Sequence, residues 1–91
     1  MTKQTVTYVA KAQPDPSRGY TVTFPDLNGC ITEGDTLKEA KRMAKDAMTG
    51  WLYTWLNEGR TTPPANYRLR SDLKKVKQFS VTVDLSDLVR K

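Results

Sequence analysis

Three short segments near the start of the chain alternate between apolar and polar residues. They cover Gln4–Ala12, Tyr20–Phe24 and Cys30–Gly34, and they are rich in the β-branched and aromatic residues that strands prefer. Proline, glycine, aspartate and asparagine fill the gaps between them, which is the composition of turns. We therefore predict three strands, with the second pairing antiparallel to the first.

A longer segment repeats its apolar residues with the period of a helix. Thr36 and Glu39 form a capping box at its start, and Gly59 followed by the proline pair at 63–64 ends it near Glu58. Its predicted apolar face consists of Leu37, Ala40, Met43, Ala44, Ala47, Met48, Trp51, Leu52 and Trp55. We interpret Gly50, which costs helix stability, as a residue that lets this helix lie close to the sheet.

The remaining chain adds one strand. Residues 60–77 are polar and basic and predict an extended or irregular segment, whereas Phe79, Val81 and Val83 alternate within a predicted strand over Gln78–Asp84. The fold class is therefore α+β, in the order βββαβ, with one long helix on an antiparallel or mixed sheet. We expect a single domain over residues 1–84 and a short tail over 85–91.

Composition excludes several classes of protein. The 91 residues suit one small domain, and their longest apolar runs are triplets, far short of the roughly 20 residues that a membrane span needs. No apolar stretch follows the N-terminus, so we expect no secretory signal. Cys30 is the only cysteine and histidine is absent, which favours a reducing cytoplasm and argues against a zinc site or a cofactor.

The candidate catalytic groups all have simpler explanations. A metal-dependent nuclease needs converging carboxylates, and those of Asp26, Glu33, Asp35, Glu39 and Asp46 are enough for at most one weakly bound cation. Cys30 has no histidine to activate it, so we assign it to the core. Trp51 and Trp55 fit either a core or an exposed platform; we favour the core, with Tyr53 as the exposed ring. We predict no enzymatic activity.

The net charge of +5 lies entirely in the last third of the chain. Residues 60–91 carry eight basic and three acidic side chains, whereas residues 1–59 are balanced. The helix adds a basic stripe formed by Lys38, Lys41, Arg42 and Lys45. Such a stripe is either a solvated helix face or a contact for phosphates or an acidic protein. A stand-alone nucleic-acid-binding module that uses this basic helix face is thus the alternative function.

One continuous segment resembles a known family. Residues 19–40 read GYTVTFPDLNGCITEGDTLKEA and are similar to the pattern of HicB-like antitoxins, a tyrosine strand followed by F-P-D-L-x-G-C and T-x-G-D-T-x-x-E-A. Thr32, Gly34, Asp35, Thr36, Glu39 and Ala40 fall in step with it. The close resemblance covers residues 19–58, and a weaker one extends to about residue 84.

This resemblance implies a fold and a function. The fold is a partial ribonuclease-H-like domain without catalytic acids. The function is that of a type II antitoxin that neutralises a HicA-type toxin, a small basic mRNA interferase. Longer members add a C-terminal DNA-binding domain, which 85–91 is too short to supply, so we expect no direct DNA binding. The implied toxin-binding residues are Phe24, Pro25, Asp26, Leu27, Glu33 and Asp35, of which the acidic ones would form a patch.

Self-association is a further expectation. A small sheet leaves strand edges whose backbone groups are unpaired, and proteins cover such edges. We predict that Thr2–Ala12 and Gln78–Asp84 are the edge strands and that the last strand pairs with its copy across a two-fold axis. The expected state is a homodimer or a higher oligomer.

Overall fold

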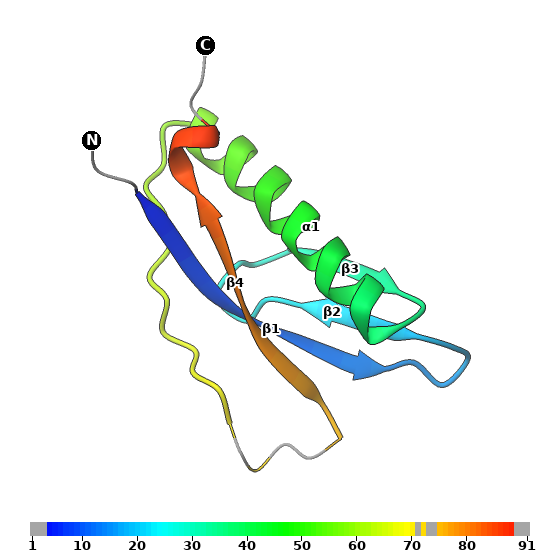
Figure 1. Ribbon diagram of the computed structural model, residues 1–91. Coiled ribbons are helices and arrows are strands. Elements are labelled where there is room, and N and C mark those ends of the chain that lie inside the picture. Colours follow the sequence, from blue (N-terminus) through cyan, green and yellow to red (C-terminus); the bar gives the residue numbers. More distant parts are fainter. Residues whose placement is uncertain (1–3, 71, 73–74, 89–91) are drawn as a thin grey trace.

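The computed structural model describes residues 4–70, 72 and 75–88 (Figure 1). It contains a four-stranded antiparallel sheet with one long helix across one face, in the predicted order βββαβ. Each predicted element is present within two residues of its expected ends. The elements are β1 (Thr5–Pro14), β2 (Tyr20–Thr23), β3 (Ile31–Gly34), α1 (Leu37–Asn57), β4 (Lys77–Asp84) and a final 3₁₀ turn (Leu85–Asp87).

The order of the strands corrects one expectation. The sheet runs β3-β2-β1-β4, so β1 lies inside it and is not an edge. The last strand returns to pair antiparallel with the first, from Thr5 opposite Asp84 to Ala12 opposite Lys77. Strand β4 thereby pairs with the side of β1 that β2 leaves free. The edges of the sheet are therefore β3 and β4.

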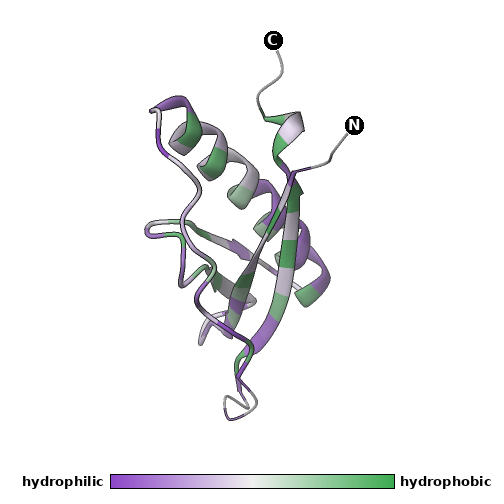
Figure 2. Cartoon of the chain, turned by 90° about the vertical axis from the view of Figure 1, so that its left-hand side faces the viewer, coloured by the Kyte–Doolittle hydropathy of each residue, from purple (hydrophilic) through white to green (hydrophobic). Residues whose placement is uncertain are grey.

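The core lies between the sheet and the helix. Every second residue of β1 points inward, so that Tyr8, Ala10 and Ala12 are buried, and Figure 2 shows the matching alternation of hydropathy along the strands. Alanines at the contact allow the helix to approach the sheet closely. The helix contributes Ala40, Ala44, Met48 and Leu52, and the other strands contribute Val22, Val81 and Val83. A single apolar layer thus holds the domain together.

Glycines act at the ends of the helix and not within it. Gly59 takes a φ of +82° immediately after the C-cap residue Glu58, as predicted for a helix stop. Gly50, however, is exposed, and a Cβ there would meet no atom within 4 Å. Our interpretation of Gly50 was wrong, because its position on the helix turns it toward solvent. The close approach to the sheet occurs at Gly34 instead.

Residues 60–70, which we call the strap, connect the helix to β4 without regular structure (Figure 1). Side chains from the sheet and from the loop between β2 and β3 hold it at several points. The Tyr8 hydroxyl donates to the Pro63 carbonyl, and the Tyr67 amide donates to the Asp26 carboxylate at 2.8 Å. The Gln78 side chain bonds both the N–H and the carbonyl of Arg70, at 2.9 and 2.7 Å. The strap therefore follows a defined path without a helix or strand.

The described start of the predicted tail packs onto the domain. The Leu85 amide donates to the Gln4 carbonyl at 2.7 Å, and Leu88 is buried against the core. Residues 89–91 lie outside the described part of the chain. Within the described ranges, no helix has the length and apolar character needed to cross a membrane.

Candidate functional site

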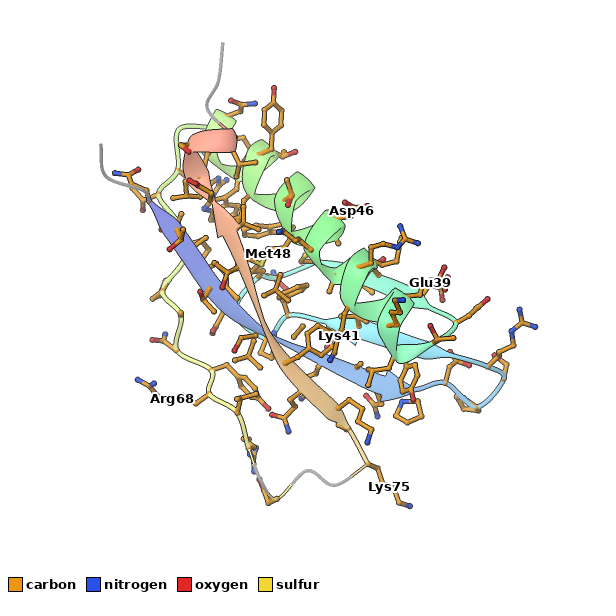
Figure 3. The ribbon with its side chains drawn as sticks, in the orientation of Figure 1. Glu39, Lys41, Asp46, Met48, Arg68 and Lys75 are labelled. Carbon is orange, nitrogen blue, oxygen red and sulfur yellow. The ribbon has the colours of Figure 1, made fainter. Side chains whose placement is uncertain are left out.

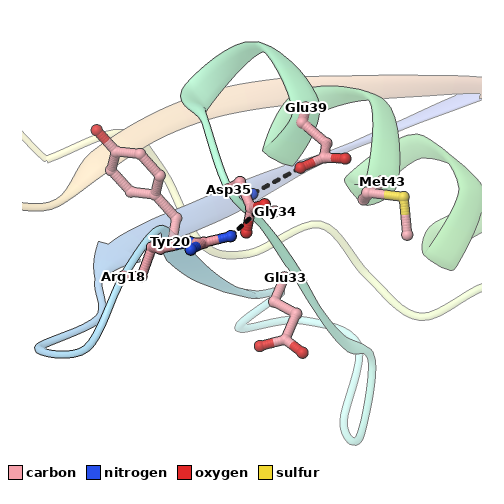
Figure 4. Close-up of a pocket in the computed structure, with 7 residues that line it drawn as sticks. All are labelled: Arg18, Tyr20, Glu33, Gly34, Asp35, Glu39 and Met43. Carbon is pink, nitrogen blue, oxygen red and sulfur yellow. Dashed lines mark hydrogen bonds and ion pairs between the residues drawn. The ribbon is translucent and has the colours of Figure 1, made fainter.

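Residues 19–40, which resemble the antitoxin family, include the junction of β3 with the helix. Thr36 is the N-cap, and its hydroxyl accepts from the Glu39 amide at 3.1 Å. The Glu39 carboxylate reaches back to the Asp35 amide at 2.7 Å, one residue beyond the usual capping-box donor (Figure 4). Two amides at the start of the helix are thereby satisfied, which fixes the chain between strand and helix.

Gly34 allows this junction to form. The residue is buried, and a Cβ at this position would lie 2.6 Å from the Ala40 nitrogen and 2.8 Å from the Ala40 Cα. These are backbone atoms of the first helical turn, which cannot move without displacing the helix. Only glycine fits here, because the end of β3 and the start of α1 are in direct contact.

A hollow of about 260 Å³ opens beside this junction (Figure 4). The Arg18 guanidinium, from the β1–β2 turn, pairs with the Asp35 carboxylate at 3.3 Å. Both side chains are largely exposed, so the pair contributes little to stability. The hollow is lined by Arg18, Tyr20, Glu33, Gly34, Asp35, Glu39 and Met43. Three carboxylates and one guanidinium line it, and Arg42 pairs with Glu39 from outside the lining. The hollow remains acidic by one charge and is suited to receive a cationic group.

The six expected toxin-binding residues occupy different environments. Phe24 and Leu27 are core residues, at 3% and 0% exposure, and therefore offer no surface to a partner. Pro25 is exposed in the loop between β2 and β3. Phe24 and Leu27 form the scaffold beneath that loop, where the Leu27 amide donates to the Phe24 carbonyl at 3.0 Å. Alternation over Tyr20–Phe24 puts Phe24 on the buried face of Val22, and it was the resemblance alone that assigned Phe24 and Leu27 to the contact.

The three predicted acidic residues do not form one patch. Glu33 and Asp35 line the hollow at the helix end of β3, whereas Asp26 lies in the loop that precedes the other end of that strand. The Asp26 carboxylate is half-buried and accepts from the Tyr67 amide. Asp26 therefore holds the strap, a role that no local sequence pattern could reveal because its partner is 41 residues away.

The basic stripe lies on the exposed side of the helix. Lys38, Lys41, Arg42 and Lys45 are all exposed, as the pattern predicts. Arg42 pairs with Glu39 at 3.7 Å, and the Lys41 ammonium lies 5.6 Å from the centre of the Phe79 ring on β4. Figure 3 shows Lys41 beside that strand. Lys41 and Lys45 border a groove of about 360 Å³ along residues 79–82 of the edge strand β4.

The aromatic residues of the helix are divided between core and surface. Tyr53 is 51% exposed, as expected, and Trp51 packs partly buried against the core. Trp55 differs from the prediction, because its ring lies outside the core cluster and its indole N–H donates to the Thr61 carbonyl at 2.7 Å. The spacing of one helical turn predicts that the two tryptophans are neighbours, but the chain that follows the helix determines their exposure.

The residues considered for catalysis or metal binding can now be placed in the structure. Among residues 4–70, 72 and 75–88, no three Asp, Glu or Cys side chains are grouped so as to hold a metal ion. Cys30 is buried, and this burial raises the pKa of its thiol to about 11, which makes it a poor nucleophile near neutral pH. Cys30 is a core residue, as predicted.

We predict that ionisation of the buried Cys30 thiol lowers the stability of the fold at high pH. Burial raises its pKa from an ordinary value of 9.0 to about 11, so the folded state favours the neutral thiol. The resulting stabilisation is complete below about pH 9 and is lost as the pH rises toward about 11. We expect the difference in Tm between wild type and Cys30→Ala to shrink between these two pH values. All other ionisable groups are the same in the two proteins, so a constant difference would contradict the prediction.

Comparison with known proteins identifies relatives of the chain. The model of the family described as "HicB_like antitoxin of bacterial toxin-antitoxin system" matches residues 8–91. An uncharacterised 14.9 kDa protein of Haemophilus phage HP1 is 35% identical over 77 residues, which are 80% of this chain and 58% of that protein. The chain spans between 26% and 58% of the length of the curated relatives that it matches.

Solved structures share the fold. The antitoxin HicB of Burkholderia pseudomallei aligns with all of this chain and 70% of its own, with a TM-score of 0.75 and 23% identity. A chain of a toxin–antitoxin complex from Streptococcus pneumoniae aligns over 97% of this chain and 75% of its own, with a TM-score of 0.76 and 21% identity. Because the family model covers nearly the whole sequence and the fold agrees, the chain belongs to the HicB-like antitoxin family of bacterial toxin–antitoxin systems.

Proposed function

We propose that this domain is an antitoxin that binds and neutralises a HicA-type mRNA interferase toxin by direct protein contact. The observation that carries the proposal is the match of the antitoxin family model to residues 8–91. The fold also occurs in a chain of a solved toxin–antitoxin complex. The role is non-enzymatic and cytoplasmic, in agreement with a single buried thiol whose raised pKa suits packing better than chemistry.

The acidic hollow is the proposed contact for a basic toxin. Glu33 and Asp35 are exposed there, beside the capping residue Glu39. Pro25 provides a second exposed point, and buried Phe24 and Leu27 hold its loop. Opposite charges across an interface raise the association rate and orient the partner. The net charge of +5 does not oppose this contact, because its excess lies in residues 60–91.

We expect charge reversal in the hollow to weaken toxin binding. Asp35→Lys or Glu33→Lys places a cation opposite a basic toxin, which should raise Kd by about tenfold. The measurement is a titration of the chain against the HicA-type toxin encoded beside its gene, together with rescue of growth when the two are co-expressed. Asp46→Lys is the matched control, since Asp46 is an exposed carboxylate on the outer side of the helix (Figure 3).

Two results would contradict parts of this proposal. If the wild-type chain neither binds the toxin nor restores growth, the antitoxin function is wrong. If Asp46→Lys weakens binding as much as Asp35→Lys, the hollow is not the contact.

The alternative, nucleic-acid binding through Lys38, Lys41, Arg42 and Lys45, is not favoured by the comparisons. The salt dependence of binding distinguishes it from the antitoxin function. Phosphate binding weakens steeply with added salt, whereas a protein contact with an apolar centre weakens far less.

We also propose that the free chain associates through β4. This strand is an edge of eight residues without a proline, and β1 is excluded because both of its sides are paired. Pairing β4 with its copy would satisfy the exposed backbone groups. Light scattering should give a mass above the 10.3 kDa protomer, and a mass that stays at 10.3 kDa on concentration would contradict the dimer.

A further inference from the structure

Two tryptophans at the C-terminal end of the helix form a fixed aromatic surface. The rings of Trp51 and Trp55 stack with their centres 4.7 Å apart and their planes at 17°. The indole N–H of Trp51 donates to the Asn28 carbonyl at 3.0 Å, and that of Trp55 donates to the Thr61 carbonyl at 2.7 Å. Both polar edges are satisfied and the rings cover one face of each other, so further contacts fall on their outer faces.

A cation already occupies one of these faces. The Arg60 guanidinium lies 4.4 Å from the centre of the Trp55 ring, and Arg60 Nε donates to Glu58 Oε1 at 3.0 Å. Because Trp51 stacks on one face of Trp55, the guanidinium must take the opposite face. The arrangement combines a cation–π contact with a charge-assisted hydrogen bond, which is how proteins bind arginine.

The surroundings favour positive charge. The last turn of the helix contains no basic residue, so no side chain of that turn offsets the partial negative charge of the helix C-terminus near Glu58. A groove of about 350 Å³ lies there, lined by Asn28, Trp51, Thr54, Trp55 and Glu58, and we call it the indole groove. The side chains of Arg60 and Glu58 are 55% and 53% exposed, so Arg60 is in contact with water and can be displaced.

We propose that the Trp55 ring and the Glu58 carboxylate, which border the indole groove, bind an arginine side chain of a basic protein partner, and that Arg60 occupies this position in the free chain. The incoming guanidinium replaces Arg60 on the Trp55 ring and at the Glu58 carboxylate. The assignment of the partner as the toxin rests on the proposed function. The affinity of the groove for arginine is a property of this chain alone.

The test is an NMR titration with an oligo-arginine peptide that follows the indole N–H signals of Trp51 and Trp55. We expect both signals to shift with the oligo-arginine peptide and neither with an oligo-glutamate peptide of equal length. Arg60→Ala removes the internal competitor and should tighten peptide binding by about two- to fivefold. Adding Glu58→Gln to that variant should reverse the gain, because the carboxylate is then lost.

Two substitutions provide matched controls. Arg68→Ala removes the same charge from an exposed position in the strap, where the side chain extends away from the ribbon in Figure 3. Asp46→Asn removes a carboxylate from the same helix. Thermal melting of each variant confirms that it is folded at the temperature of the titration. If Arg60→Ala binds the peptide no more tightly than Arg68→Ala, the indole groove is not an arginine site.

The toxin provides an independent readout. We expect Glu58→Gln to weaken toxin binding more than Asp46→Asn does. If the wild-type chain binds the toxin and these two variants bind it equally well, the groove is not a toxin contact, but the proposed function stands. Absence of toxin binding by wild type would overturn the proposed function, whereas the peptide titration would still decide whether the groove binds arginine.

Discussion

Replacing Gly34 by alanine is expected to destabilise the domain by about 3 kcal/mol or more. The added Cβ would lie 2.6 Å from the Ala40 nitrogen, so the first turn of the helix must move away from β3. For a domain of this size such a loss lowers Tm by roughly 10–25 °C. Thermal unfolding followed by circular dichroism measures it directly.

Gly50→Ala is the matched control for this substitution. It adds the same methyl group at an exposed helical site where no atom lies within 4 Å, so we expect it to stabilise the domain by about 0.5–1 kcal/mol. If Gly34→Ala lowers the free energy of unfolding and Gly50→Ala raises it, the loss at Gly34 comes from contact with the helix and not from replacing a glycine as such. A Gly34→Ala protein that melts like wild type would show that β3 and α1 do not touch as described.

Leu27→Ala is the second large effect, with an expected loss of about 2–5 kcal/mol. Leu27 is completely buried, so truncation leaves a cavity beneath the loop that carries Pro25. Urea denaturation should show a lower midpoint with an unchanged slope. Toxin binding should fall only as far as the folded population falls.

Pro25→Ala separates the scaffold from the contact. Pro25 is exposed, so its substitution should change stability by no more than about 0.5 kcal/mol. Weaker toxin binding by this stable variant would place Pro25 in the interface. If Leu27→Ala retained full stability while losing the toxin, Leu27 would belong to the interface and not to the core.

Local patterns were sufficient to predict the elements of this fold. The capping box at Thr36 and Glu39 and the helix stop at Gly59 depend on residues that are close in sequence, and both are confirmed. Tyr8, Ala10 and Ala12 occupy alternate positions of the predicted strand Gln4–Ala12 and share its buried face for the same reason. Such features require no knowledge of the distant chain.

Features that join distant segments could not be predicted in this way. Alternation in β1 shows that one of its faces is buried, but not that β4 pairs along its side, since edge and central strands share this pattern. The contact of Asp26 with Tyr67 and the stacking of Arg60 on Trp55 depend on the path of the strap. The same limit explains why Asp26 was grouped with Glu33 and Asp35 at the site.

The pairing of the first strand with the last has a consequence for synthesis of the chain on the ribosome. Residues 77–84 are made after the other three strands and the helix, and until they emerge one side of β1 has no partner. The nascent chain can already form its hairpin and helix, whose contacts are local, but it carries an open edge of about eight residues that favours pairing with other chains. This edge is therefore protected only once β4 has left the ribosome.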